Sequence, residues 1–190
     1  MRKKPTIIML TAALLLLLLF TVPLWKITLS APQYPDGLKM YLNIDGISDG
    51  GTGDLKNINI MNHYVGMKEI DQEDFKEFEI IPLIVIGLVL SGIIFALLKK
   101  RSLIIFWIGI FALLGIVGLY VFYQWEYEYG HNLDPKAAIK VPGAAYQPPL
   151  LGKKEILNFI AGSYPHIGAY LILISMSLAA YSWYLLKDSK

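Results

Sequence analysis

Four long runs of apolar residues divide the chain. They cover residues 7–25, 80–98, 103–123 and 167–186, and none of them contains a charged side chain. A helix needs about 20 apolar residues to cross the hydrocarbon core of a bilayer. The pattern therefore predicts an α-helical integral membrane protein with four transmembrane helices.

Two polar segments separate these runs, and together they predict a small mixed α/β cap. Alternating apolar and polar residues over 38–44 predict a strand, and the spacing over 55–67 favours a helix. Residues 153–161 predict a short amphipathic surface helix. Each segment is too short to build a core alone, so we expect the two to pack on each other. The predicted order is transmembrane helix 1–25, outer segment 26–79, transmembrane helix 80–98, turn 99–102, transmembrane helix 103–123, outer segment 124–166, and transmembrane helix with tail 167–190.

Charge predicts the orientation of these helices. Eight of the seventeen Lys and Arg residues lie at the helix ends near the two termini and in the 99–102 turn, against one acidic residue, Asp188. Positive residues stay on the cytoplasmic side. We therefore expect both termini in the cytoplasm and the cap on the opposite, outer side of the membrane. The first run has the length of a full span, which favours an uncleaved signal anchor over a signal peptide cleaved after Ala31.

Composition narrows the possible functions. The chain has no cysteine, which excludes disulfides and thiolate metal ligands. No stripe of basic and aromatic residues indicates nucleic-acid binding. The spans contain no Asp, Glu, Lys, Arg or His, which argues against a proton-coupled transporter.

No catalytic sequence motif is present, and we predict a protein that is not an enzyme. A membrane enzyme using Glu126, Glu128, His131 and Asp134 is a weaker alternative, since nothing in their spacing specifies a reaction. Both glutamates alternate with aromatic residues, which is typical of a wet belt at the membrane interface.

The sharpest candidate for chemistry surrounds His63. Met61 and Met67 flank it, and on a continuous helix His63 and Met67 would share a face. Asn59, one turn earlier, would support that face. Imidazole and thioether ligands suit copper, especially Cu(I), better than calcium or magnesium. The alternative is that the methionines fill an apolar core and His63 is an ordinary hydrogen-bonded residue.

Three further residues could complete such a site from the same side of the membrane. Met40 could supply an exchangeable thioether. His131 could join the site, oriented by the Asp134 carboxylate three residues later. His166 could be a ligand if the cap folds over it, but its place at a helix start favours an interfacial or capping role.

Several strings of the outer segments are similar to a known family. These are PLWKITLSAPQYP at 23–35, NHYVGM at 62–67, WEYEYGHNLDP at 125–135 and YQPPL at 146–150. Together with the four-span layout they resemble a family of four-span bacterial membrane proteins associated with nitrous-oxide reductase and copper accessory gene clusters. The resemblance implies a copper or respiratory accessory role and carries over no functional residue.

The sequence thus predicts an accessory protein, or chaperone, that binds or hands over copper on the periplasmic face. The expected partners are the bilayer, a periplasmic copper enzyme such as the nitrous-oxide reductase of denitrification or a copper lipoprotein, and other membrane subunits. The alternative is a structural or electron-transfer subunit of a respiratory membrane complex without a metal of its own. A haem variant of that alternative would pair His131 with His166.

Overall fold

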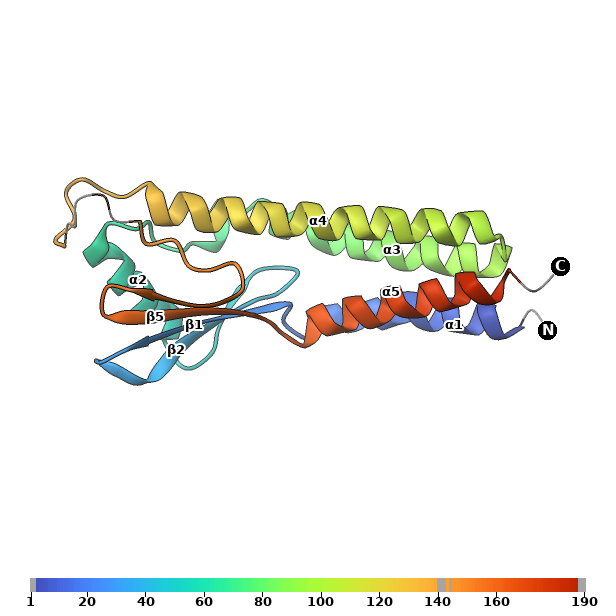
Figure 1. Cartoon of the computed structure of the whole chain (residues 1–190), viewed down its shortest axis with the longest axis horizontal. Helices are drawn as coiled ribbons and strands as arrows, with labels where there is room; N and C mark the ends of the chain where they lie inside the picture. Colours follow the sequence, from blue (N-terminus) through green and yellow to red (C-terminus); the bar gives the residue numbers. More distant parts are fainter. Residues whose placement is uncertain (1–2, 140–142, 144, 188–190) are drawn as a thin grey trace.

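Four long apolar helices dominate the protein, whose computed structural model describes residues 3–139, 143 and 145–187 (Figure 1). They are α1 (Lys3–Leu15) with its 3₁₀ continuation η1 (Leu16–Phe20), α3 (Glu77–Leu98), α4 (Arg101–His131) and α5 (Ile167–Leu185). Each is long and apolar enough to cross a membrane. The prediction of four such helices is confirmed, and α4 continues beyond the predicted span at 103–123 to His131.

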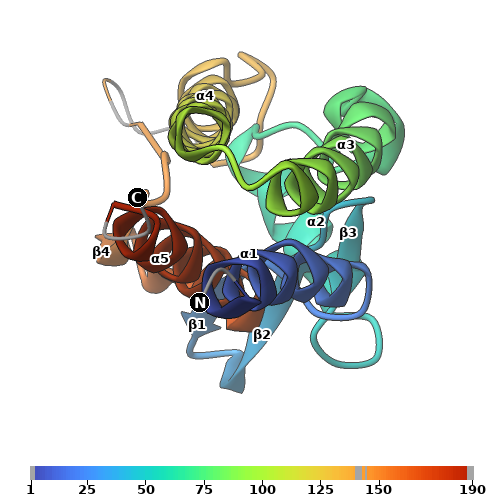
Figure 2. The ribbon, with the colours of Figure 1, turned by 90° about the vertical axis from the view of Figure 1, so that its right-hand side faces the viewer.

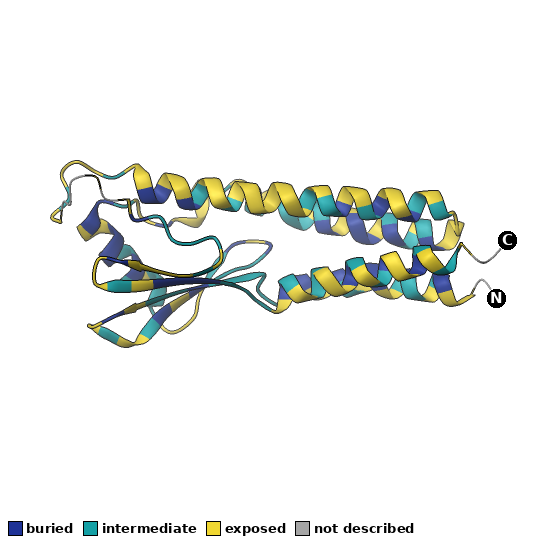
Figure 3. Ribbon diagram, in the orientation of Figure 1, coloured by how far each residue is buried: buried dark blue, intermediate teal, exposed yellow. Residues whose placement is uncertain are grey.

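In the helix bundle α1 packs against α3 and α5, and α4 completes the bundle on the opposite side by packing against the same two helices. Gly92 of α3 lies so close to α1 that an added Cβ would be 2.8 Å from the Ala13 Cβ. Trp107 of α4 is buried and donates a 3.0 Å hydrogen bond to the Leu88 carbonyl of α3. Ser175 of α5 donates to the Ala12 carbonyl at 2.8 Å. Seen along the bundle, the four helices surround one core (Figure 2). Their outward faces are exposed (Figure 3), and many of the exposed side chains are large and apolar, which suits contact with lipid.

A five-stranded antiparallel sheet forms the other end of the molecule. Its strands are β1 (Trp25–Ala31), β2 (Tyr34–Leu42), β3 (Ile47–Asp49), β4 (Gly152–Ile156) and β5 (Phe159–Pro165). Their order is β3-β2-β1-β5-β4, so the central pair joins the strand after α1 to the strand before α5. Ile27 of β1 lies opposite Met40 of β2 and Ser163 of β5.

The short amphipathic helix predicted over 153–161 is wrong, because this segment forms the β4–β5 hairpin. Leu157 adopts a positive φ of 55° at its turn. The pairing that decides the strand is distant in sequence: Lys26 to Ser30 of β1 lie opposite Tyr164 to Ile160 of β5. Thr28 lies against Gly162, where an added Cβ would be 2.6 Å from the Thr28 Oγ1. Tertiary pairing therefore overrides the local pattern.

Helix α2 (Asp54–Val65) covers one face of the sheet, with the short η2 (Gln72–Asp74) beyond it. The predicted strand over 38–44 and the predicted helix over 55–67 correspond to β2 and α2. The last two turns of α4 also reach this core, where Tyr129 packs with Ile58 and Met61. We call the sheet, α2, residues 124–131 of α4 and their connections the sheet domain.

Candidate functional site

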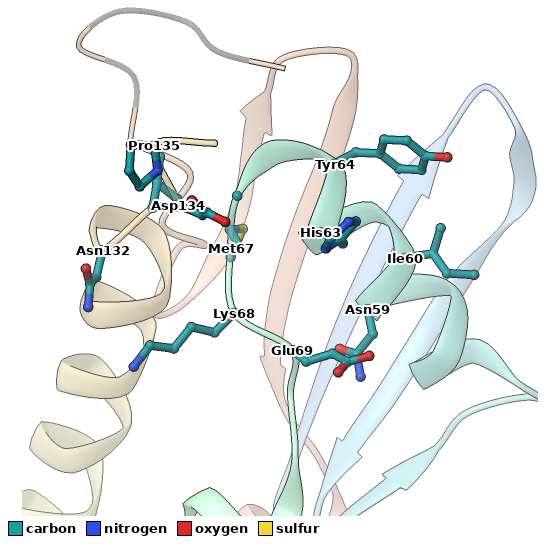
Figure 4. Close-up of a pocket in the computed structure, with 12 residues that line it drawn as sticks. Asn59, Ile60, His63, Tyr64, Met67, Lys68, Glu69, Asn132, Asp134 and Pro135 are labelled. Atoms are coloured by element: carbon teal, nitrogen blue, oxygen red, sulfur yellow. The ribbon is translucent and has the colours of Figure 1, made fainter. Parts of the chain in front are cut away.

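An open depression of about 640 Å³ lies between α2 and the end of α4 (Figure 4). His63, Met67, Asn59 and Asp134 all line it. The structure therefore brings four of the eight residues singled out in the sequence to one surface. Lys68 and Glu69 add charged side chains to its wall.

His63 and Met67 reach the depression by a different route from the one the helical spacing predicted. Helix α2 ends at Val65, and Gly66 turns the chain with a φ of 83°. The Met67 amide then donates a 2.8 Å hydrogen bond to the Asn62 carbonyl, a glycine-based helix stop. His63 is therefore an exposed residue of the last helical turn, and Met67 is a half-buried residue just beyond it.

The side chains of Asn59 and Asp134 form hydrogen bonds with backbone groups. They do not orient His63 or His131. The Asn59 amide exchanges two hydrogen bonds with the backbone of Ile70, at 3.2 and 2.9 Å. The Asp134 carboxylate accepts from the Lys136 amide at 2.7 Å, and the Asp134 amide donates to the Gly66 carbonyl at 2.8 Å. Of these contacts, the bond from the Asp134 amide to the Gly66 carbonyl joins the segment after α4 to the segment after α2, and the others stabilise each segment locally.

His131 and His166 have other surroundings. His131 is exposed at the end of α4, where its ring stacks on Tyr127 at 4.0 Å and its Nδ1 lies 2.9 Å from the Tyr127 carbonyl. His166 immediately precedes α5 without a side-chain capping bond. Its ring packs edge-on against Tyr41 at 5.1 Å, and its buried Nδ1 has no hydrogen-bond partner among the described residues. The end of α4 and the start of α5 lie at opposite ends of the sheet domain, so the two histidines are not brought together (Figure 1).

The three methionines proposed as ligands lie largely beneath the surface of the depression. Met40 and Met61 are buried in the core between the sheet and α2, and Met67 packs against the same core. All three line a second, interior cavity of about 60 Å³, which His63 does not line. Within the described part of the chain, no group of three or more His, Asp or Glu side chains is arranged to hold a metal ion.

Glu126 is the residue that sequence reasoning missed. We expected both Glu126 and Glu128 in a wet belt at the membrane interface. Glu128 is exposed, as a wet position requires, and pairs with Lys68 at 3.0 Å. Glu126 instead faces the core with 1% of its surface exposed and lines the interior cavity. Both of its carboxyl oxygens lack a hydrogen-bond partner among the described groups.

Burial changes the acid–base behaviour of this carboxyl group. Glu126 lies beyond the predicted membrane-spanning part of α4, within the sheet domain. Desolvation by its apolar neighbours raises the pKa of Glu126 from 4.5 to about 8. The sequence could have predicted this burial. If the helix is continued past residue 123, residue 126 shares one face with residues 122, 129 and 130.

Comparison with known proteins identified no protein similar to this chain. No family model matches the chain, and neither curated proteins nor solved structures gave a match.

Proposed function

We propose that this protein is a non-enzymatic accessory protein of the bacterial inner membrane that binds copper on its periplasmic face. It hands the metal over during maturation of a respiratory copper enzyme such as nitrous-oxide reductase. The observation that carries the proposal is the meeting of His63 and Met67 at one solvent-open depression. Imidazole and thioether together form a mixed donor pair that suits Cu(I).

The openness of the depression fits transfer better than storage. His63 is exposed and Met67 is half-buried, so a partner protein can reach the donors directly. Two protein ligands leave coordination positions that a partner's ligands can take. The carboxylates of Glu69 and Asp134 line the depression and favour a bound cation electrostatically, while the Lys68 cation at its edge is paired with Glu128.

The arrangement of the helices is consistent with a periplasmic sheet domain. The start of α1, the end of α5 and the α3–α4 turn lie at the end of the bundle away from the sheet (Figure 1). Lys99, Lys100 and Arg101 occupy that turn. With the positive ends in the cytoplasm, the sheet domain and its depression face the periplasm.

Copper binding to the depression is tested by titrating the purified full-length protein with Cu(I) against a competing chelator. We expect His63→Ala and Met67→Leu each to weaken binding about tenfold or more, as loss of a direct metal ligand should exceed the loss of an outer partner. His131→Ala is the matched control, since this exposed histidine is engaged with Tyr127.

Unchanged Cu(I) affinity in the double variant His63→Ala, Met67→Leu would remove the depression as the copper site. An equal loss of Cu(I) affinity in that variant and in His131→Ala would mean that any exposed histidine contributes to binding. That result would also refute the depression as the specific copper site.

A further inference from the structure

The interior cavity of the sheet domain is separate from the open depression. Met40 reaches it from β2, Met61 from α2 and Glu126 from α4. The exposed fractions of these residues are 3%, 8% and 1%. Three elements that are far apart in the sequence thus place two thioethers and one carboxyl group around one buried space.

Glu126 is the anomaly of this cavity. Buried polar atoms are normally paired, because desolvation without a partner costs free energy. Yet both Glu126 oxygens lack a hydrogen-bond partner among the described groups, and the described residues that line the cavity include no Lys, Arg or His. The carboxyl group therefore faces the cavity with its ligand capacity unused by the protein.

The size of the cavity restricts what Glu126 can meet there. Organic ligands and cofactors occupy pockets of about 300 Å³ or more. At about 60 Å³ this cavity is too small for a haem, a quinone or a lipid chain. A single ion needs much less room.

The ligand types restrict the ion. Thioethers are soft ligands that select Cu(I)-like ions, whereas calcium and magnesium require a shell of oxygens that this cavity does not offer. The Met61 Sδ has only a weak contact with the Gln33 amide nitrogen at 4.0 Å, which a metal ion can replace. Binding of a monovalent ion would displace the Glu126 proton to solvent, and the resulting carboxylate would balance the charge of the ion, so the site stays without net charge.

We infer that Met40, Met61 and Glu126 form an interior site for a soft monovalent metal ion of the Cu(I) class. The thioethers select the ion and the carboxylate neutralises it. This inference rests on the proposed function for the use of copper, but it uses different residues. Met67 lines both the interior cavity and the open depression, so the two sites are neighbours that share one side chain.

The test uses Ag(I), a redox-inert ion with the ligand preferences of Cu(I), and the full-length protein in detergent. The His63→Ala variant serves as background, because it removes the imidazole donor of the depression. Equilibrium dialysis with metal analysis should show stoichiometric Ag(I) in this background. Adding Glu126→Gln, or Met40→Leu with Met61→Leu, should weaken binding about tenfold or more. Met176→Leu, in α5, is the control for methionine loss.

Leucine and glutamine are close in size to the residues they replace, so these variants keep the core filled. Their thermal unfolding is measured alongside binding. X-ray absorption of the Cu(I)-loaded background should detect sulfur ligands, and the Met40→Leu, Met61→Leu addition should remove them.

Two outcomes overturn the interior site: no Ag(I) bound in the His63→Ala background, or binding unchanged by both the Glu126 and the methionine substitutions. Either result leaves the proposed function intact if His63→Ala alone still weakens Cu(I) binding. Conversely, if Ag(I) binding depends on Glu126 and the two methionines while His63→Ala does not change Cu(I) affinity, the copper site at the depression is refuted and the interior site is supported.

Discussion

The Gly130 carbonyl accepts a 2.9 Å hydrogen bond from the Tyr146 amide, which ties the end of α4 to the connection before β4. This contact is possible because residue 130 has no side chain: an added Cβ would lie within 2.3 Å of the backbone of Gln147. Glycine is therefore required here for close approach and not for an unusual φ.

Gly130→Ala should lower the thermal stability of the protein, because the connection must move away from α4. We expect a loss of about 1–3 kcal/mol, the range for overpacking a filled site. The matched control is Gly118→Ala on the same helix, where an added Cβ meets nothing within 4 Å. That change should be neutral or slightly stabilising, since alanine favours helix. Thermal unfolding in detergent measures both, and equal midpoints would refute the close contact.

Glu126 should make the metal-free protein less stable as the pH rises. The unfolded carboxyl group ionises near its ordinary value of 4.5, whereas burial keeps the folded group protonated up to about 8. Between these values the folded state holds one more proton than the unfolded state. The free energy of unfolding therefore falls by about 1.4 kcal/mol per pH unit over this window and levels off above it.

Glu126→Gln should flatten this dependence and raise the unfolding midpoint at pH 8. Measurement requires a metal chelator, and Glu128→Gln is the control because that carboxylate is exposed beside Lys68. Parallel pH profiles for the protein and its Glu126→Gln variant would show that the carboxyl group is not desolvated.

Ser163 joins three segments of the sheet domain. It is fully buried, accepts a 2.7 Å hydrogen bond from the Trp25 indole and donates to the Leu150 carbonyl at 3.1 Å. Ser163→Ala leaves both partners unsatisfied and should cost about 1–3 kcal/mol of stability. Ser177→Ala, which removes only a bond within its own helix to Leu173, should cost much less. Similar losses in the two variants would contradict this assignment.

The absence of cysteine allows a direct test of orientation. Thr52 lies on the exposed surface of the sheet domain, and Ser102 is exposed at the α3–α4 turn. A membrane-impermeant thiol reagent applied to intact cells should label Thr52→Cys and not Ser102→Cys. Permeabilised cells, in which both should react, provide the control. The reverse pattern would place the sheet domain in the cytoplasm.

The helices could be predicted because membrane spans leave a local signal: every residue of 80–98 is uncharged, whatever the rest of the chain does. The strand around Met40 and the helix around Ile58 also follow from local alternation and spacing. The β4–β5 hairpin could not be predicted in this way, because its strand character depends on β1, which is more than 100 residues away.

The candidate site was predictable to a similar degree. Ligand chemistry brought out His63 and Met67, and the fold places both at one depression, although the turn at Gly66 replaces the expected helical spacing. Glu126 was misread because its burial depends on how far α4 extends and on what packs against that extension. Glu126 and Glu128 are two residues apart, and only the helical twist separates a core position from a solvent position.

The central strands of the sheet have a mechanical consequence. β1 and β5 are neighbours in the sheet, and α1 and α5, which they adjoin in the chain, are neighbours in the bundle. The Leu24 carbonyl accepts from the His166 amide where the two connections run side by side. Because α4 also extends into the sheet domain, three helices join that domain to the bundle, and its movement relative to the bundle is restricted. If a partner docks at the depression as proposed, this arrangement would hold the depression at a fixed distance and angle from the helix bundle, so the partner's own shape would determine whether it can reach the site.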